Sequence, residues 1–329
     1  MSAWLLKALG FLMICATIGM ALSRAPDRPV ETLVARWAPP PSDFIEVQGM
    51  AVHVRDEGPR QDPEPVVLVH GTGASLHTWE GWVQALTKAQ RRVITFDLPG
   101  FGLTGPRPEG APGATDYRAA TDARFVLDLL DTMKVKRFVI GGNSLGGNVA
   151  WRVAAAAPDR VARLILVDAA GPAVQAESIP LGFQIARVPV LNRIGEHLLP
   201  RSVVAASLQN VYGEPTRVSS ALVDRHFELT LREGNRRALA QRLARWAPGE
   251  GAEAIATLRL PTLILWGGRD RLIPPAVAQV FKRDIPGSEL VMFDDLGHVP
   301  HEEQPQRTVQ PVLAFLGTSA AGPATPTSP

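Results

Sequence analysis

The sequence predicts an α/β protein whose mostly parallel β-sheet has helices on both faces and a helical insertion. Short runs of consecutive apolar residues, as expected for strands covered on both faces, alternate along the chain with segments of helical periodicity. Such alternation is typical of a parallel sheet flanked by helices. The alternation stops over residues 171–256, which are rich in Arg and Leu at helical spacing and contain no apolar strand run.

The expected elements follow one another from residue 44. Two short strands flank Gly49, and helix 116–133 places Phe125, Leu129 and Met133 on one face. The expected strands are 44–48, 50–55, 66–69, 93–96, 138–140, 164–167, 263–266 and 290–293. The expected helices are 76–88, 116–133, 144–157, 275–283 and 301–316.

This pattern divides the chain into a core in two parts, residues 44–170 and 257–317, interrupted by residues 171–256. We expect the interruption to form a lid over the C-terminal edge of the sheet, because open α/β sheets bind ligands at that edge.

Composition narrows the possible partners. Hydrophobic residues make up 46% of the 329 residues, so the chain can bury a large core. The net charge is +2 without any block of like charge, which argues against a nucleic-acid partner. Cys15 is the single cysteine, so the rest of the sequence can form neither a disulfide nor a cysteine metal site.

The ends of the chain differ from its body. An uncharged apolar run, 8–22, lies between Lys7 and Arg24, and residues 1–24 are expected to be a membrane anchor. The alternative is a cleaved signal peptide with a cleavage site near Ser23. Either places the body on the non-cytoplasmic side. Residues 25–43 are expected to be a Pro-rich spacer and residues 318–329 a disordered tail.

Ser144 is the candidate nucleophile. It lies in Gly142-Asn143-Ser144-Leu145-Gly146, between strand 138–140 and the following helix. An abrupt strand-to-helix turn needs small neighbours and lifts the serine hydroxyl clear of the sheet. It also directs the helix N-terminus at the reacting centre. The alternative is a glycine-rich loop in which Ser144 is only a helix N-cap.

A serine nucleophile needs a base within reach. His298 follows the last strand, at the predicted active edge of the sheet, and His301 is its rival three residues later. His53 falls in an early strand, and His197 and His226 fall in the insertion, so these three are weaker candidates.

The base in turn needs a carboxylate that orients it and stabilises its cation. Asp270 follows strand 263–266, and the rival Asp168 ends strand 164–167. We favour Asp270.

Two backbone N–H groups are expected to hold the oxyanion. One belongs to Leu145, directly after the serine, and the other to Thr72, with Gly73 as the alternative. Further pocket candidates are His70, Gly71, Gly73, His77 and Asn143, of which His70 is expected to have a structural hydrogen-bonding role. This chemistry requires neither a metal nor an organic cofactor.

Residues 44–316 resemble the α/β-hydrolase superfamily, in its branch with a helical cap. The resemblance rests on five motifs in order: His70-Gly71-Thr72-Gly73, Asp97-Leu98-Pro99-Gly100-Phe101-Gly102, the serine turn, Trp266-Gly267-Gly268-Arg269-Asp270 and Gly297-His298-Val299-Pro300. It implies a triad in the order Ser144, Asp270, His298.

The resemblance leaves several reactions open. Dehalogenases and epoxide hydrolases of this family use an aspartate where this chain has Ser144. Carbon–carbon bond hydrolases match around Ser144, but many carry a tryptophan where this chain has Val299.

The preferred hypothesis is hydrolysis of a small, apolar ester or lactone through an acyl-serine. One alternative is carbon–carbon bond hydrolysis of a vinylogous diketone acid, with the insertion arginines Arg232, Arg236 or Arg237 holding the acid. For these arginines a solvated helix face is the favoured interpretation. The other alternative is a non-catalytic binding protein.

Overall fold

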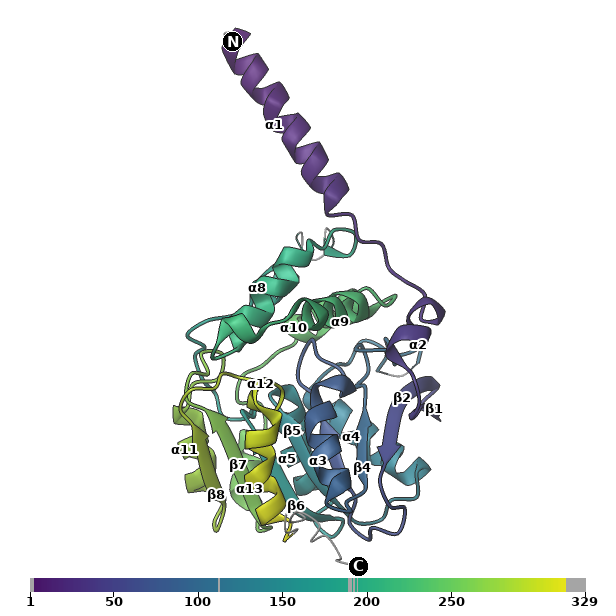
Figure 1. Ribbon diagram of the computed structural model, residues 1–329, viewed down its shortest axis with the longest axis vertical. Coiled ribbons are helices and arrows are strands. Elements are labelled where there is room, and N and C mark those ends of the chain that lie inside the picture. Colours follow the sequence, from purple (N-terminus) through teal and green to yellow (C-terminus); the bar gives the residue numbers. More distant parts are fainter. Residues whose placement is uncertain (1–2, 112, 189–190, 192, 194, 318–329) are drawn as a thin grey trace, which may run out of the picture.

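The sheet in the computed structural model has eight strands in the order β1-β2-β4-β3-β5-β6-β7-β8 (Figure 1). The structure describes residues 3–111, 113–188, 191, 193 and 195–317. β2 is antiparallel to both β1 and β4, and the strands from β4 to β8 pair in parallel. The strands are β1 (Ser42–Val47), β2 (Met50–Glu57), β3 (Val66–Val69), β4 (Val93–Phe96), β5 (Phe138–Asn143), β6 (Val161–Val167), β7 (Thr262–Gly267) and β8 (Glu289–Phe293).

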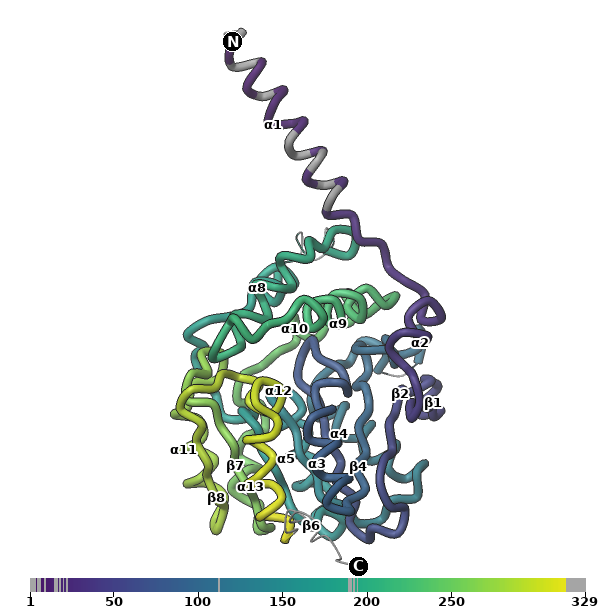
Figure 2. The backbone as a smooth tube through the Cα atoms, viewed as in Figure 1, coloured from purple at the N-terminus to yellow at the C-terminus, as the bar shows by residue number. Residues whose placement is uncertain are grey.

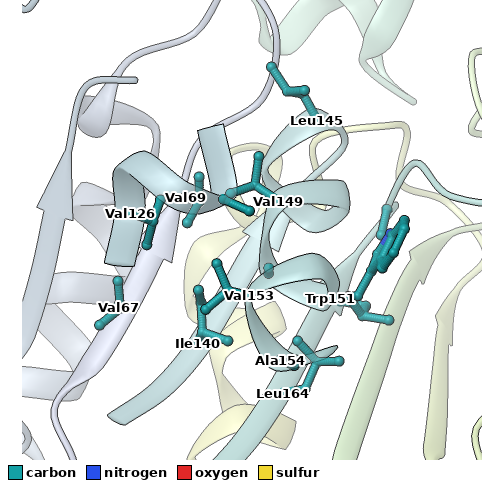
Figure 3. Packing of buried hydrophobic residues seen from close by; sticks show 14 of the residues in the cluster. Val67, Val69, Val126, Ile140, Leu145, Val149, Trp151, Val153, Ala154 and Leu164 are labelled. Atoms are coloured by element: carbon teal, nitrogen blue, oxygen red, sulfur yellow. The ribbon is translucent and has the colours of Figure 1, made fainter. Parts of the chain in front are cut away.

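Helices cover both faces of this sheet because its central strands are apolar on both sides. Val67 and Val69 of β3 pack in one cluster with α4 (Ala119–Thr132), α5 (Leu145–Ala156) and α11 (Ala276–Asp284). Val66 and Leu68 pack in the other cluster with α3 (Glu80–Lys88) and α13 (Pro305–Phe315). Figure 3 shows Val149 and Val153 of α5 beside Val69 and Ile140 of the sheet. The predicted fold class is confirmed.

Two predicted helices are each divided. The helix expected over 76–88 consists of the 3₁₀ turn η1 (Leu76–Trp79) followed by α3. The helix expected over 301–316 consists of α12 (Pro300–Glu303) and α13, because Gln304 is not helical and Pro305 begins a new first turn.

Helices of the insertion lie over the sheet, as Figure 1 shows for α8, α9 and α10. They are α6 (Leu181–Arg187), α8 (Arg201–Val211), α9 (Ser220–Thr230) and α10 (Asn235–Ala244), with the 3₁₀ turn η2 (Pro215–Arg217) between α8 and α9. We use "helical insertion" for residues 181–244. The turn η3 (Ala252–Thr257) was expected in the lid, but its Ile255 is buried in the cluster that contains α5. The turn η3 therefore belongs with the core rather than with the helical insertion, and the lid function of the insertion stays a prediction.

The expectation of a Pro-rich spacer over 25–43 is wrong. The segment contains α2 (Glu31–Trp37), whose Leu33 is 1% exposed and packs with Leu103 and Leu229. The Trp37 indole donates to the Glu228 carboxylate at 2.8 Å. The prolines flank α2 and do not interrupt it, and Leu33 and Trp37, four residues apart, share the face that packs against the body.

Figure 2 shows the path of the N-terminal segment from α1 to α2. α1 (Ala3–Leu22) stands away from the body, and the chain then passes along the helical insertion to α2. Backbone hydrogen bonds join Ala25 to His197 at 2.9 Å and Arg28 to Leu231 at 2.6 Å along this path.

Within the residues described, no helix is both long enough and apolar enough to cross a bilayer. The anchor or signal peptide expected over residues 1–24 stays a prediction. The tail expected over 318–329 lies outside the described residues.

Candidate active site

Ser144 occupies a strained turn between β5 and α5. Its φ is 55° and its ψ is −117°, in a region that side-chain-bearing residues rarely adopt. Its N–H donates to the Val167 carbonyl at 3.1 Å, and its carbonyl accepts the N–H groups of Asn148 and Ala170, each at 3.0 Å. Because hydrogen bonds hold both sides of the peptide, the serine keeps this conformation and lines a cavity.

The glycines around Ser144 have a steric reason. A Cβ on Gly146 would lie 2.0 Å from the Val69 carbonyl oxygen, and one on Gly142 would lie 2.2 Å from the Gly146 carbonyl oxygen. Neither contact is possible, so only glycine allows α5 to begin this close to the sheet.

His298 and Asp270 form a buried pair beside Ser144's cavity. Asp270 Oδ2 lies 2.7 Å from His298 Nδ1, and Asp270 Oδ1 accepts the N–H groups of Leu272 at 2.8 Å and Ile273 at 2.9 Å. These bonds fix the carboxylate, which engages Nδ1 of the imidazole and leaves Nε2 for the cavity that His298 and Ser144 both line.

The loop after β3 lies against the serine. A Cβ on Gly71 would come within 3.3 Å of Ser144 Cβ, and Gly71, Thr72 and Gly73 all line the same cavity. Leu145 is the first residue of α5. The two segments expected to supply oxyanion donors therefore adjoin Ser144.

The cavity has a volume of about 190 Å³. The described residues with charged side chains in its lining are Arg236 and Glu302, apart from the histidines, and both are paired, with Asp27 and Arg225 respectively. The rest of the wall that the helical insertion supplies is mainly aliphatic: Ile185, Leu198, Leu199, Val203, Val204, Leu208 and Leu239, together with Phe183.

A family model described as the α/β hydrolase fold matches residues 64–305, which is most of the chain. The chain belongs to the α/β-hydrolase family. It is an enzyme of the hydrolase class, and the alternative of a non-catalytic binding protein is set aside.

Three similar proteins illustrate the range of this family. The dihydrolipoyllysine-residue acetyltransferase component of an acetoin cleaving system from Pseudomonas putida is 32% identical over 77% of this chain, but the match spans only 63% of that relative. A 2-hydroxy-6-oxononadienedioate/2-hydroxy-6-oxononatrienedioate hydrolase from Paraburkholderia phymatum is 29% identical, over 82% of this chain and 91% of its own length. A solved structure of a bacterial membrane phospholipase A is 25% identical, with a TM-score of 0.69, and covers 96% of this chain and 98% of its own.

In this α/β hydrolase, His301 and Asp168, the alternatives to His298 and Asp270, do not take part in the hydrogen bond between the base and its carboxylate. His301 Nε2 lies 3.0 Å from the Thr78 hydroxyl, and the His301 ring packs at 4.1 Å from that of Trp79. Burial lowers the pKa of His301 to about 3, so its imidazole stays neutral. Asp168 is buried beside the His298–Asp270 pair without a direct hydrogen bond to the imidazole.

Two pocket candidates do not reach the cavity, whereas Gly71, Gly73 and Asn143 line it. His70 is fully buried: its Nδ1 lies 2.8 Å from the Gly71 carbonyl oxygen, and its Nε2 accepts the Leu98 N–H at 2.9 Å. His77 Nε2 lies 2.8 Å from the Trp37 carbonyl oxygen of α2. Both come after β3, but the His70 ring contacts the neighbouring loops and the His77 ring contacts the end of α2.

His226, which the sequence offers only as a weaker candidate base, lies on the cavity wall, and the sequence did not predict this position. His226 of α9 has Nδ1 at 3.0 Å from the Gly73 carbonyl oxygen, so this nitrogen must donate. Burial and the nearby Arg225 lower the pKa of His226 to about 4, which keeps the ring neutral. Tyr212 donates to Glu302 at 3.2 Å on the same wall. These contacts join the helical insertion to distant segments, and no local sequence pattern indicates them.

Replacing His226 by alanine should lower kcat by roughly tenfold, because the loop that carries Thr72 loses one hydrogen bond that fixes it. Steady-state ester hydrolysis measures the effect. His197→Ala removes an exposed histidine of the same insertion and should leave kcat unchanged. Equal rates for His226→Ala and His197→Ala would contradict a role of His226 in holding the loop.

Proposed function

We propose that this hydrolase cleaves carboxylic esters or lactones with an apolar acyl group through an acyl-serine. One observation carries the proposal. Ser144 in its strained turn and the hydrogen-bonded His298–Asp270 pair line or adjoin one cavity whose wall is mainly aliphatic. An aliphatic wall favours an apolar acyl group, because burial of apolar surface stabilises the complex.

In the first half-reaction, Nε2 of His298 accepts the proton of the Ser144 hydroxyl while Oγ attacks the substrate carbonyl carbon. The tetrahedral intermediate collapses to an acyl-serine, and the imidazolium returns the proton to the leaving alkoxide, which departs as the alcohol. In the second half-reaction His298 takes a proton from water. The hydroxide attacks the ester carbonyl, and Ser144 leaves with the proton.

The negative charge of each tetrahedral intermediate falls on the former carbonyl oxygen. We propose that the N–H groups of Leu145 and Thr72 hold this oxygen. The position of Leu145 at the N-terminus of α5 supports its part, because the first N–H groups of a helix have no partner within the helix. The closeness of Gly71 to Ser144, where a Cβ on Gly71 would come within 3.3 Å of Ser144 Cβ, supports the part of its neighbour Thr72.

The similarity to the solved membrane phospholipase A also supports an ester substrate, because that enzyme's name refers to phospholipids, which are esters. The match covers 96% of this chain. The ion pairs of the charged wall residues also favour an apolar acyl group. Arg236 is paired with Asp27 and Glu302 with Arg225, so neither offers a free charge to a polar acyl group.

The second candidate is hydrolysis of a carbon–carbon bond in a dienone acid, which the relative from Paraburkholderia phymatum favours by its name. That substrate needs a cation for its carboxylate. Arg236 is paired with Asp27, Arg232 donates to the carbonyl groups of Glu233 and Thr104, and Arg237 is 61% exposed near Glu109 and Glu196. The acid-holding role that this alternative gives to the insertion arginines is therefore weakly supported, and the ester is preferred.

Competing substrates test this choice. We expect the full chain to hydrolyse p-nitrophenyl esters, to prefer acyl chains longer than acetate, and to turn over a chromogenic dienone acid at least about tenfold more slowly by kcat/KM. A fluorophosphonate probe should label Ser144, and mass spectrometry of the labelled peptide identifies the residue. Faster cleavage of the dienone acid than of every ester would overturn the ester proposal, although labelling would persist.

A further inference from the structure

Asp168 is a buried acid that the proposed reaction does not use. It directly follows β6, is fully buried, and has a φ of 42°, which few side-chain-bearing residues adopt. Its N–H donates to the Leu265 carbonyl at 3.0 Å, so the neighbouring strand holds the backbone in this conformation. A strained residue beside a candidate active site invites a functional explanation.

The two carboxyl oxygens of Asp168 have different surroundings. Oδ1 accepts the Gly267 N–H at 2.9 Å, whereas Oδ2, if it carries no proton, has no hydrogen-bond partner among the described residues. One oxygen each of Asp168 and Asp270 and one ring nitrogen of His298 lie within 4.8 Å of one another. A buried, unpaired anionic oxygen this close to a second carboxylate is strongly unfavourable. A shared proton removes both problems.

The surrounding donors decide which of the two acids carries that proton. Asp270 accepts the Leu272 and Ile273 N–H groups and also engages His298, three interactions that stabilise its anion. Asp168 accepts only the Gly267 N–H. Because hydrogen bonds to a carboxylate favour its charged form, the charge belongs on Asp270 and the proton on Asp168.

The charged groups around Asp168 also favour its protonated form. Burial and the negative charge of Asp270 raise the pKa of Asp168 well above its usual range, and Glu303 of α12 adds to the rise. Glu303 is itself paired with Arg217 at 3.1 Å. His298 engages Asp270 through its Nδ1.

We infer that Asp168 is a neutral carboxylic acid whose Oδ2–H donates to the Asp270 carboxylate. Asp168 is thereby a positioning residue that acts through Asp270. Together with the Leu272 and Ile273 N–H groups, it holds the Asp270 carboxylate so that Oδ2 of Asp270 faces His298 Nδ1. The inference rests on the proposed function only in assigning Asp270 and His298 to the reaction of Ser144.

Two substitutions separate this role from a structural one. In Asp168→Asn, the amide oxygen can accept the Gly267 N–H, and the amide NH₂ can donate to Asp270 as the acid does. In Asp168→Ala both bonds are lost. We expect Asp168→Ala to lower kcat by roughly tenfold, as befits one hydrogen bond to a charged group, and Asp168→Asn to restore most of that loss.

The pH profile reveals the charge of Asp168. Asn replaces a neutral acid without changing charge, so the acid limb of kcat/KM should stay where it is in the wild type. If Asp168 were ionised, Asp168→Asn would remove a negative charge beside the imidazolium and move the acid limb to lower pH. Such a shift would overturn the inference.

Two further measurements do not depend on turnover. The infrared difference spectrum between wild type and Asp168→Asn at neutral pH should contain the C=O stretching band of a protonated carboxyl group. Melting temperatures supply the second measurement. Asp168 ionises on unfolding but keeps its proton when folded, so wild-type stability should fall relative to Asp168→Asn as pH rises from about 5 to about 8. A missing band and a pH-independent difference in melting temperature would refute a neutral Asp168, whether or not the enzyme cleaves esters.

Discussion

Ser144→Ala should reduce ester turnover by about 10⁴-fold or more, because no acyl-serine can form without the hydroxyl. The residual rate would come from the oxyanion donors and from substrate binding. Alanine adds no atoms to the turn, and the backbone bonds to Val167, Asn148 and Ala170 do not use the side chain. The melting temperature should therefore remain close to that of the wild type, and KM should change far less than kcat.

The measurement is initial-rate hydrolysis of a p-nitrophenyl ester, with labelling by a fluorophosphonate in parallel. Ser202→Ala is the matched control, since Ser202 is an exposed serine on α8. It should retain both turnover and labelling. A folded Ser144→Ala variant with more than about a hundredth of wild-type kcat would show that another group attacks the substrate.

The sequence could predict the strands, their mostly parallel arrangement and the positions of the candidate triad at strand ends, because each depends on a local pattern. An apolar run such as Val66–Val69 can be a strand only if both faces are covered, and the structure covers them with α3 and α5. Gly142 and Gly146 mark the turn at Ser144 because their absent side chains leave room for backbone oxygens. His298 and Asp270 each follow a strand that ends at one edge of the sheet.

Other features required tertiary packing that no local pattern specifies. Leu33 and Trp37 lie in a Pro-rich stretch, and their partners Leu229 and Glu228 are nearly two hundred residues away. The contact of His226 with the Gly73 carbonyl likewise joins α9 to the loop after β3. Periodicity predicts that a helix has an apolar face, but it does not identify the surface which that face covers.

These distant contacts connect the helical insertion to the catalytic loops at two points. His298 donates its backbone N–H to the Val211 carbonyl at the end of α8, at 2.7 Å. His226 of α9 bonds the loop that contains Thr72. The segment that forms the aliphatic wall thus also holds the loop of the proposed base, His298, and the loop of the proposed oxyanion donor, Thr72. Substitutions that reshape the wall to change acyl preference should therefore be made away from Val211 and His226.

Asp270→Asn should lower kcat by about 10⁴-fold, because it reverses the tautomer of His298. Asparagine can keep its amide oxygen on the Leu272 and Ile273 N–H groups, which donate to Oδ1 of Asp270 in the wild type. Its NH₂ group then faces His298 Nδ1 at the place of Oδ2. Two donors cannot share one bond, so Nδ1 must accept and the ring proton moves to Nε2. With its proton on Nε2, the imidazole cannot take the proton of Ser144, although every residue keeps its place.

The comparison with Asp294→Asn isolates this effect, because Asp294 is an exposed aspartate directly after β8 and its replacement should leave kcat unchanged. Melting temperatures should show that Asp270→Asn is folded, and the tautomer can be read from the ring-nitrogen NMR shifts of His298. Retention of more than about a tenth of wild-type kcat by Asp270→Asn would mean that another carboxylate orients the base. In that event Asp168 is the group to replace next, since it is the other acid within 4.8 Å of the imidazole in the described structure.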